Sequence, residues 1–403
     1  MPATSTDGPD ARLRRARAAV GACFFVNAVL YANLVPRLPE LKAELGLSNT
    51  ALGTALAAQP LGALLAGLTV APLISRVGSA RVAGVGLPVL AAAVWTAAAA
   101  PHWGVLAGAL LVAGAVDAAV DVAQNAQGLR VQRRYGRSII NAFHGTWSVG
   151  SLAGGLLGAA AAGLGVPLPL HLGVIAALFG IPALLGARLL LAGSDDGPTA
   201  TSPPGAARRP RTPVVVGVAA LGALAACAVV VEDAGSSWSA LYLRVELDAA
   251  PAVAGLGFVA LSLAMTVGRF TGDRAVDRFG RRRVVQAGGL LSAVGFGAAL
   301  ALPSVPATLA GFALAGLGVA TLVPAAYSAA DELPGLRPGL GLALVNVLLR
   351  IGFLVVPPFI GVVADATSLR VALLAVVAAG VGTALLARSL PAGPPPRHAT
   401  GPE

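Results

Sequence analysis

Long apolar runs constrain this sequence more than any other feature. A helix needs about 20 mostly apolar residues to cross the hydrocarbon core of a bilayer, because each residue adds about 1.5 Å. Twelve runs meet that length: 18–36, 49–74, 81–100, 103–129, 139–163, 167–191, 213–237, 251–272, 283–302, 305–330, 339–364 and 369–389. The sequence therefore predicts an all-α membrane protein with twelve transmembrane helices.

The charge content supports this prediction. Only 11% of the residues are charged and the mean hydropathy is +0.80, whereas a soluble domain carries about 25% charged residues. Most of the surface must therefore face the lipid bilayer. The net charge of +10 would suggest a nucleic-acid partner in a soluble protein. Here the cations lie between the apolar runs, so we interpret them as topology signals and expect no nucleic-acid partner.

The basic residues also predict an orientation. With the N-terminus inside the cell, 23 of the 28 fall in cytoplasmic segments and four in outer loops. The four are Arg37, Lys42, Arg244 and Arg370, while Arg350 lies within a helix. Cytoplasmic loops are enriched in arginine and lysine, so both termini are expected in the cytoplasm. The run from Ala18 has no clear cleavage site, which favours an uncleaved first helix over a signal peptide.

A polar linker divides the chain. We expect a cytoplasmic tail at 1–17, a six-helix bundle at 18–191, a cytoplasmic linker at 192–212, a second bundle at 213–389 and a cytoplasmic tail at 390–403. The halves repeat at an offset of 202, with Arg76, Gly78 and Arg81 matching Arg278, Gly280 and Arg283. Duplicated halves predict a pseudo-symmetric pair of bundles, with a binding site near mid-membrane at their interface.

The segment 272–283 resembles the signature of the major facilitator superfamily. Asp277, Arg278, Gly280, Arg281 and Arg282 match its core, although Asp273 occupies the usual place of the leading glycine. In the first half, Arg76 and Gly78 follow Ser75, which replaces the acidic residue. The resemblance implies the superfamily's transporter fold and a cytoplasmic gate. In that gate Asp277 would accept hydrogen bonds from a helix N-terminus, and the arginines would form ion pairs or simply fix the topology.

A narrower resemblance lies in three segments. Residues 121–128, 143–145 and 232–243 are similar to a bacterial group related to sugar permeases such as the fucose–proton symporter. The resemblance implies transport in a bacterial cytoplasmic membrane and does not fix the substrate.

Polar residues inside the fourth apolar run form a stripe. Charged residues at a helix centre cost about 2.5–3.5 kcal/mol or more, so each is a functional candidate. Asp117, Asp121, Gln124, Asn125 and Gly128 recur at helical spacing. They either line a water-filled cavity or bond to neighbouring helices.

Other polar residues add to the predicted substrate and proton pathway. His144 is expected close to Asp121, where it carries a proton or bonds to a backbone carbonyl. Asn27 and Tyr31 supply polar groups in the first helix.

The second half supplies the remaining candidates. Of Glu232 and Asp233 only one can face a cavity, because adjacent helical residues diverge by about 100°; the alternative places both at the membrane surface. Arg350, one turn after Asn346, requires an acidic partner such as Glu232 or Asp233, or an anionic substrate. Pro324 and the pair Pro357 and Pro358 are expected to kink their helices.

These features predict a secondary transporter of a small organic molecule that works by alternating access, with proton coupling through Asp121 or Glu232. The alternative is a non-transporting receptor or sensor on the same fold. Sugar import and drug export remain open, as do symport, antiport and uniport. The four histidines do not converge and no nucleotide-binding motif occurs. We therefore expect no enzyme activity, metal or cofactor, and take the superfamily's usual monomer as the default.

Overall fold

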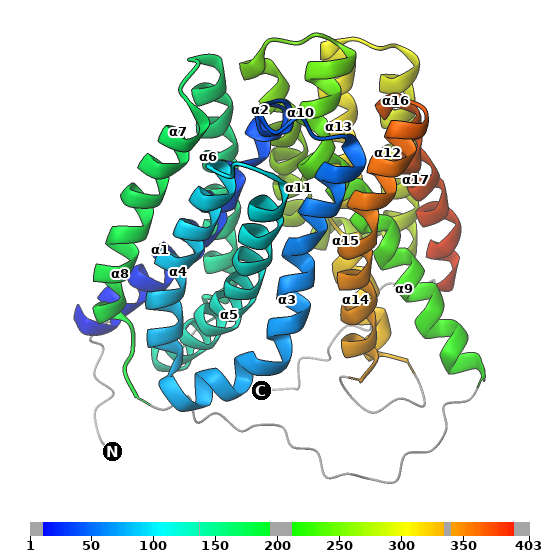
Figure 1. Ribbon diagram of the computed structural model, residues 1–403. Helices are drawn as coiled ribbons and strands as arrows, with labels where there is room; N and C mark the ends of the chain where they lie inside the picture. The colour runs from blue at the N-terminus through cyan, green and yellow to red at the C-terminus, as the bar shows by residue number, and fades with distance from the viewer. Residues whose placement is uncertain (1–10, 137, 194–211, 334–339, 391–403) are drawn as a thin grey trace. The chain divides into compact units, whose positions relative to one another are not determined.

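A computed structural model describes residues 11–136, 138–193, 212–333 and 340–390, and within these ranges every regular element is helical (Figure 1). The first half contains α1 (Ala11–Ala32), α2 (Leu38–Glu44), α3 (Asn49–Val77), α4 (Ser79–Ala98), α5 (Trp103–Tyr135), α6 (Ile140–Gly163), α7 (Leu168–Ile175) and α8 (Ile181–Gly186). The second contains α9 (Thr212–Asp233), α10 (Ser239–Leu241), α11 (Pro251–Phe279), α12 (Arg281–Ala301), α13 (Val305–Val319), α14 (Leu322–Asp331), α15 (Leu340–Ala366), α16 (Leu369–Ala372) and α17 (Leu374–Leu386). Short 3₁₀ or π segments join several of them: η1 (Val35–Arg37), η2 (Ala176–Gly180), η3 (Ala187–Leu189), η4 (Ala234–Trp238), η5 (Tyr242–Glu246) and η6 (Ala387–Ser389).

The predicted membrane fold is confirmed. Eleven spans in the described ranges are long and apolar enough to cross a bilayer. The twelfth is α6, whose 24 residues reach about 36 Å at 1.5 Å per residue. Its first turns carry Asn141, His144 and Ser148, which lower its hydropathy below that of the other spans.

The chain forms two compact units, 1–47 with 54–203, and 48–53 with 204–403. In the first unit α1 packs on α5 and α6, while α4 packs on α5 and on the α7–α8 span. In the second unit α12 packs on α13 and α17, α11 packs on α13, and α9 packs on α15 and α17.

Residues 48–53 group with the second unit, where the backbone N–H groups of Asn49 and Thr50 donate to the Asp365 carboxylate at 2.9 and 2.8 Å. Most of the predicted linker, 194–211, lies outside the described residues.

The first span is longer than its apolar run. α1 begins at Ala11, and the helical path continues through η1 and α2 to Glu44. Arg37, expected in an outer loop, is 1% exposed. Its guanidinium donates to Glu40 and to the Val166 carbonyl, and its Nη1 lies 3.1 Å from His171 Nδ1. Hydropathy alone places an arginine in a loop, but these partners allow it to be buried.

The seventh span also extends beyond the predicted 213–237. It continues through the π-helical η4, the short α10 and the π-helical η5 to Glu246. Trp238, Leu241, Tyr242 and Leu243 in this extension are fully buried. Burial of these large side chains therefore holds the span together past its predicted end.

The prolines have different effects in two spans. The tenth span breaks between α13 and α14, at Ala320 and Thr321, shortly before Pro324. Pro324 thus lies in the first turn of α14, where its missing N–H has no intrahelical partner to lose. By contrast, α15 is assigned as one continuous helix through Pro357 and Pro358.

The sequence repeat has a structural counterpart at the turns after α3 and α11. Gly78 has φ 84° and ψ 145°, and Gly280 has φ 83° and ψ 148°. Each residue immediately precedes the next helix, α4 or α12. Residues with a Cβ avoid this region, so both halves require glycine here.

Candidate functional site

The amide of Asn27 joins three helices of the first unit. Its Nδ2 donates to Asp117 Oδ1 on α5 at 2.6 Å, and its Oδ1 accepts from Trp147 Nε1 on α6 at 3.0 Å. Asn27 is buried, whereas Asp117 and Trp147 are half-buried. Tyr31, one turn further along α1, is also half-buried. Trp147 was not among the predicted site residues, although it lies three positions after His144 on the same helix.

Asp121 bonds within its own helix. Asn125 Nδ2 donates to Asp121 Oδ1 at 3.1 Å, and Gln124 Nε2 reaches the same oxygen at 3.4 Å. The Asp121 side chain is exposed, and Gln124 Oε1 is buried without a hydrogen-bond partner in the described part of the chain. Asp121 and Asn125 therefore share one face of α5.

His144 is exposed and makes an edge-to-face contact with Phe24, with ring centroids 5.2 Å apart. Within the described ranges no side-chain hydrogen bond joins it to Asp121. The structure therefore gives no hydrogen bond for the expected proton transfer between these two residues.

Asp233 is the most deeply buried carboxylate among the predicted site residues of the second unit, at 3% exposure. Its Oδ1 accepts from Ser237 Oγ at 2.7 Å, and its Oδ2 has no hydrogen-bond partner in the described residues. The Trp238 indole is near this carboxylate but outside hydrogen-bond geometry, and its Nε1 is likewise buried without a partner. The π-helical η4 follows Asp233 directly. Because a π turn holds one more residue than an α turn, it brings residues four and five positions apart towards the same side.

Glu232 differs from its neighbour. It is half-buried, and the cation that acts on it electrostatically is Arg269 of α11. The two adjacent carboxylates thus occupy different surroundings, as their angular separation on a helix requires.

Arg350 and Asn346 lie on α15 beside Tyr327 of α14. Tyr327 Oη donates to Asn346 Oδ1 at 3.0 Å, and Arg350 acts electrostatically on the Tyr327 hydroxyl. All three side chains are half-buried. Throughout the described ranges, no ion pair joins Arg350 to Glu232, Asp233 or another carboxylate.

In the signature segment 272–283, Arg281 forms an ion pair. Its guanidinium makes a bidentate contact with Glu332 at the end of α14, at 2.9 and 3.0 Å. Arg278 lies over the Phe279 ring at 5.4 Å. Asp277 and Arg282 are not buried, and no helix N-terminus in the described ranges donates to Asp277. In the first half, Arg76, which matches Arg278 in the sequence repeat, is exposed.

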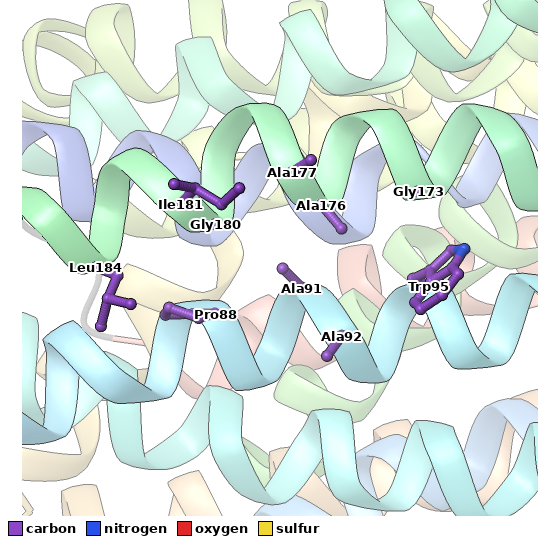
Figure 2. Close-up of a pocket in the computed structure, with 10 residues that line it drawn as sticks. All are labelled: Pro88, Ala91, Ala92, Trp95, Gly173, Ala176, Ala177, Gly180, Ile181 and Leu184. Atoms are coloured by element: carbon purple, nitrogen blue, oxygen red, sulfur yellow. The ribbon is translucent and has the colours of Figure 1, made fainter.

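Two hollows lie within the units. A polar one of about 170 Å³ is lined by Arg269, Asp273, Arg281, Thr321 and Ser328 with four apolar or small neighbours. A larger one of about 320 Å³ lies between α4 and the α7–α8 span (Figure 2). Its lining contains no charged side chain, and its one indole, Trp95, donates to the Pro169 carbonyl at 3.0 Å. Because it offers no group to orient a polar substrate, we do not place the candidate site there.

A buried polar cluster that we did not predict stabilises the end of the first unit. Arg130 donates to the carbonyls of Leu191, Ala192 and Gly193 just after η3, where a cation is favourable near a helix C-terminus. Gln127 bonds to both the N–H and the carbonyl of Leu191. The polar stripe of α5 does not predict this cluster, because Arg130 is nine positions from Asp121 and so lies about 180° around the helix from it. Arg130 is one of the 23 basic residues that the sequence places in cytoplasmic segments as topology signals.

Comparison with known proteins places the fold. A family profile for the Major Facilitator Superfamily matches residues 20–231 and 221–403. An uncharacterised MFS-type transporter of Yersinia pestis is 31% identical over 87% of this chain and 89% of its own length. The membrane protein MosC of Rhizobium meliloti is 32% identical over 90% of this chain and 87% of its own.

Solved structures agree with these relatives. A mutant of the nucleoside transporter NupG superposes with a TM-score of 0.74 at 12% identity, covering 93% of this chain and 99% of that one. The D-xylose-proton symporter superposes with a TM-score of 0.68 at 16% identity, covering 94% and 98%. Since the family profile and both relatives extend over most of the chain, this protein is a multi-pass membrane transporter that belongs to the major facilitator superfamily.

Proposed function

We propose that this protein is a secondary active transporter, which moves a small organic molecule across a bacterial cytoplasmic membrane by alternating access with coupling to protons. The two six-helix halves, 18–191 and 213–389, would move against each other as the site opens to one side and then the other. Family membership supports transport, and a fold neighbour named as a proton symporter supports coupling as a property this fold can host.

The observation that carries the coupling proposal is Asp233. Its carboxylate is buried, has a single hydrogen-bond donor, and forms no ion pair in the described chain. An ionised carboxylate in such surroundings is costly, whereas the protonated acid is not. A conformational change that hydrates this site would favour release of the proton, so proton occupancy and conformation become linked.

Asp121 and Glu232, which we considered first from sequence, have surroundings that link them less tightly to conformation. Asp121 is exposed and already bonded to Asn125. Glu232 is half-buried and acted on by Arg269. Each therefore has a partner for its ionised state, an amide donor for Asp121 and a cation for Glu232, whereas no cation pairs with Asp233 in the described chain.

The test is proton movement in proteoliposomes with an internal pH dye, challenged with sugars, drugs and organic acids. We expect a compound-dependent pH change in the wild type that falls to the level of empty liposomes in Asp233→Asn. Glu232→Gln and Asp121→Asn are matched controls and should keep coupled flux. A thermal unfolding profile close to wild type would show that Asp233→Asn is folded.

Other outcomes have definite meanings. Loss of coupling only in Asp121→Asn or Glu232→Gln would move the proton site to that residue. Movement of labelled compound with no pH change would indicate uniport and contradict coupling. Absence of flux for every compound would contradict the transport proposal itself.

A further inference from the structure

We infer that Arg350 and Asn346 form a binding site for the carboxylate group of an organic monoanion, which makes the transported molecule an acid. This inference rests on the proposed transport function and names the substrate class that it leaves open. It follows from the depth of Arg350, from the position of the surrounding acids and from the orientation of the Asn346 amide.

Arg350 lies deep in its span. It is the eleventh of the 27 residues of α15, about 15 Å from one end and about 24 Å from the other at 1.5 Å per residue. A guanidinium at such a depth is costly without an anion, and arginines within membrane spans characteristically face partners or a water-filled path. The described residues provide no carboxylate within ion-pair distance.

The helix packing explains why the nearby acids do not reach it. Two close approaches show which side of α15 packs on α9: Leu348 lies against Gly222, and Gly352 lies against Val229. Arg350 is two positions from each of them, and therefore roughly 160–200° around the helix. Glu232 and Asp233 belong to α9. The Arg350 side chain leaves α15 on the side that faces away from α9. This rotation turns Arg350 away from the partners suggested by sequence, in agreement with the absence of such an ion pair among the described residues.

The neighbouring polar groups are arranged as hydrogen-bond donors. Tyr327 donates its hydroxyl proton to Asn346 Oδ1, so the acceptor of this amide is occupied and its two N–H groups remain available. Asn346 and Arg350 are four residues apart and share one face of α15. An amide and a guanidinium on one face present only donors, which match an anionic acceptor.

The number and shape of the donors favour a carboxylate. Arg350 is the only basic side chain on α14 or α15 in the described ranges, so these two helices supply one positive charge. A planar guanidinium fork binds a planar carboxylate through two parallel hydrogen bonds. A phosphate dianion would retain a negative charge in this part of the membrane. Tyr327 then acts as a positioning residue, because it holds the amide in its donor orientation.

The test measures ligand binding in detergent, without a proton gradient, by thermal unfolding. The probes are matched pairs, glucuronate with glucose and benzoate with benzyl alcohol, and glucose 6-phosphate is the phosphate arm. We expect a carboxylate member of a pair to stabilise the wild type and its neutral partner to have no effect. Arg350→Gln should weaken that binding at least about tenfold, since it removes one member of a desolvated charge pair.

Two further variants separate the roles. Tyr327→Phe should weaken carboxylate binding by less than Arg350→Gln, because the cation remains while the amide loses its fixed orientation. Arg244→Gln removes an exposed arginine of the same unit and should leave carboxylate binding unchanged. If Arg350→Gln alone loses stability without ligand, Arg350→Lys keeps the charge and should retain part of the binding.

Some results would overturn the inference. These are equal binding of neutral and carboxylate members, preference for the phosphate, no binding by either carboxylate at millimolar concentration, or unchanged binding in Arg350→Gln. Transport of a neutral compound with intact proton coupling would also overturn it while leaving the proposed function standing. Arg350-dependent carboxylate binding without any proton-coupled flux would uphold the site and contradict the proposed coupling instead.

Discussion

At the scale of single residues, two buried polar side chains of the first unit each bond to several other groups. Asn27 does so by bonding both the Asp117 carboxylate and the Trp147 indole. Arg37 does so at the end of the same span, with Glu40, His171 and Val166 around it. Removal of either hub would take these hydrogen bonds from its partners, and a buried group left without its bond costs more than the bond itself contributes.

Arg37 gives the clearest residue-scale prediction. Arg37→Gln should lower the free energy of unfolding by about 2–3 kcal/mol, because charged hydrogen bonds are lost and Glu40 and the Val166 carbonyl lose their donor. Arg244→Gln is the control, since Arg244 is 43% exposed and pairs with Asp248 at 3.5 Å; it should cost less than about 1 kcal/mol. Thermal unfolding in detergent measures both variants. Equal stability of the two variants would contradict the structural role assigned to Arg37.

At the scale of elements, regular helices are interrupted where polar groups gather. The seventh span changes to π geometry immediately after Asp233 and again at Tyr242, and the tenth span breaks before Tyr327. A π turn departs from regular α-helical hydrogen bonding and is frequently found at functional sites. Here Asp233 and Ser237 bond four positions apart and Trp238 stays nearby, so the candidate proton site lies where the helix changes pitch.

The paired glycines give the element-scale prediction. Gly78→Ala and Gly280→Ala should each cost about 1–3 kcal/mol, because both residues hold backbone angles that a side chain disfavours. At Gly78 a Cβ would meet only the Gly193 carbonyl oxygen, at 4.0 Å, so the cost comes from the backbone. Gly108→Ala is the matched control within α5, where an added Cβ meets nothing within 4 Å. Since alanine favours helices more than glycine does, that variant should be neutral or stabilising in the same unfolding assay.

At the scale of the whole molecule, the distribution of basic residues predicts which ends of the spans face the cytoplasm. A green fluorescent protein fused after Glu403 should fluoresce, because it folds in the cytoplasm. An alkaline phosphatase inserted after Leu302, between α12 and α13, should be active, because that enzyme requires the outer side. The reverse pattern of activities would contradict the predicted orientation of both termini.

The sequence by itself determined the class of fold. Apolar run length is a local property, and a helix in lipid bonds its own backbone, so twelve spans could be counted without tertiary contacts. The glycine at 78 and its repeat at 280 were visible in the same way, because a turn geometry is specified by one or two residues. The stripe on α5 followed from helical periodicity, and the bond between Asp121 and Asn125 agrees with it.

The tertiary structure decided which polar groups meet. Sequence suggested partners for His144 and Arg350 by proximity along the chain and by charge, but the direction of a side chain depends on how its helix is rotated against its neighbours. That rotation is set by packing, such as Leu348 and Gly352 against α9, which directs Arg350 away from Glu232 and Asp233. The sequence predicts that Arg37 and Arg130 lie in loops, because hydropathy counts the cost of burying a charged side chain. It cannot include the hydrogen-bond partners that offset that cost. Apart from Glu40, which is three positions from Arg37, those partners come from segments more than sixty positions away, and only the folded chain brings them within hydrogen-bond distance.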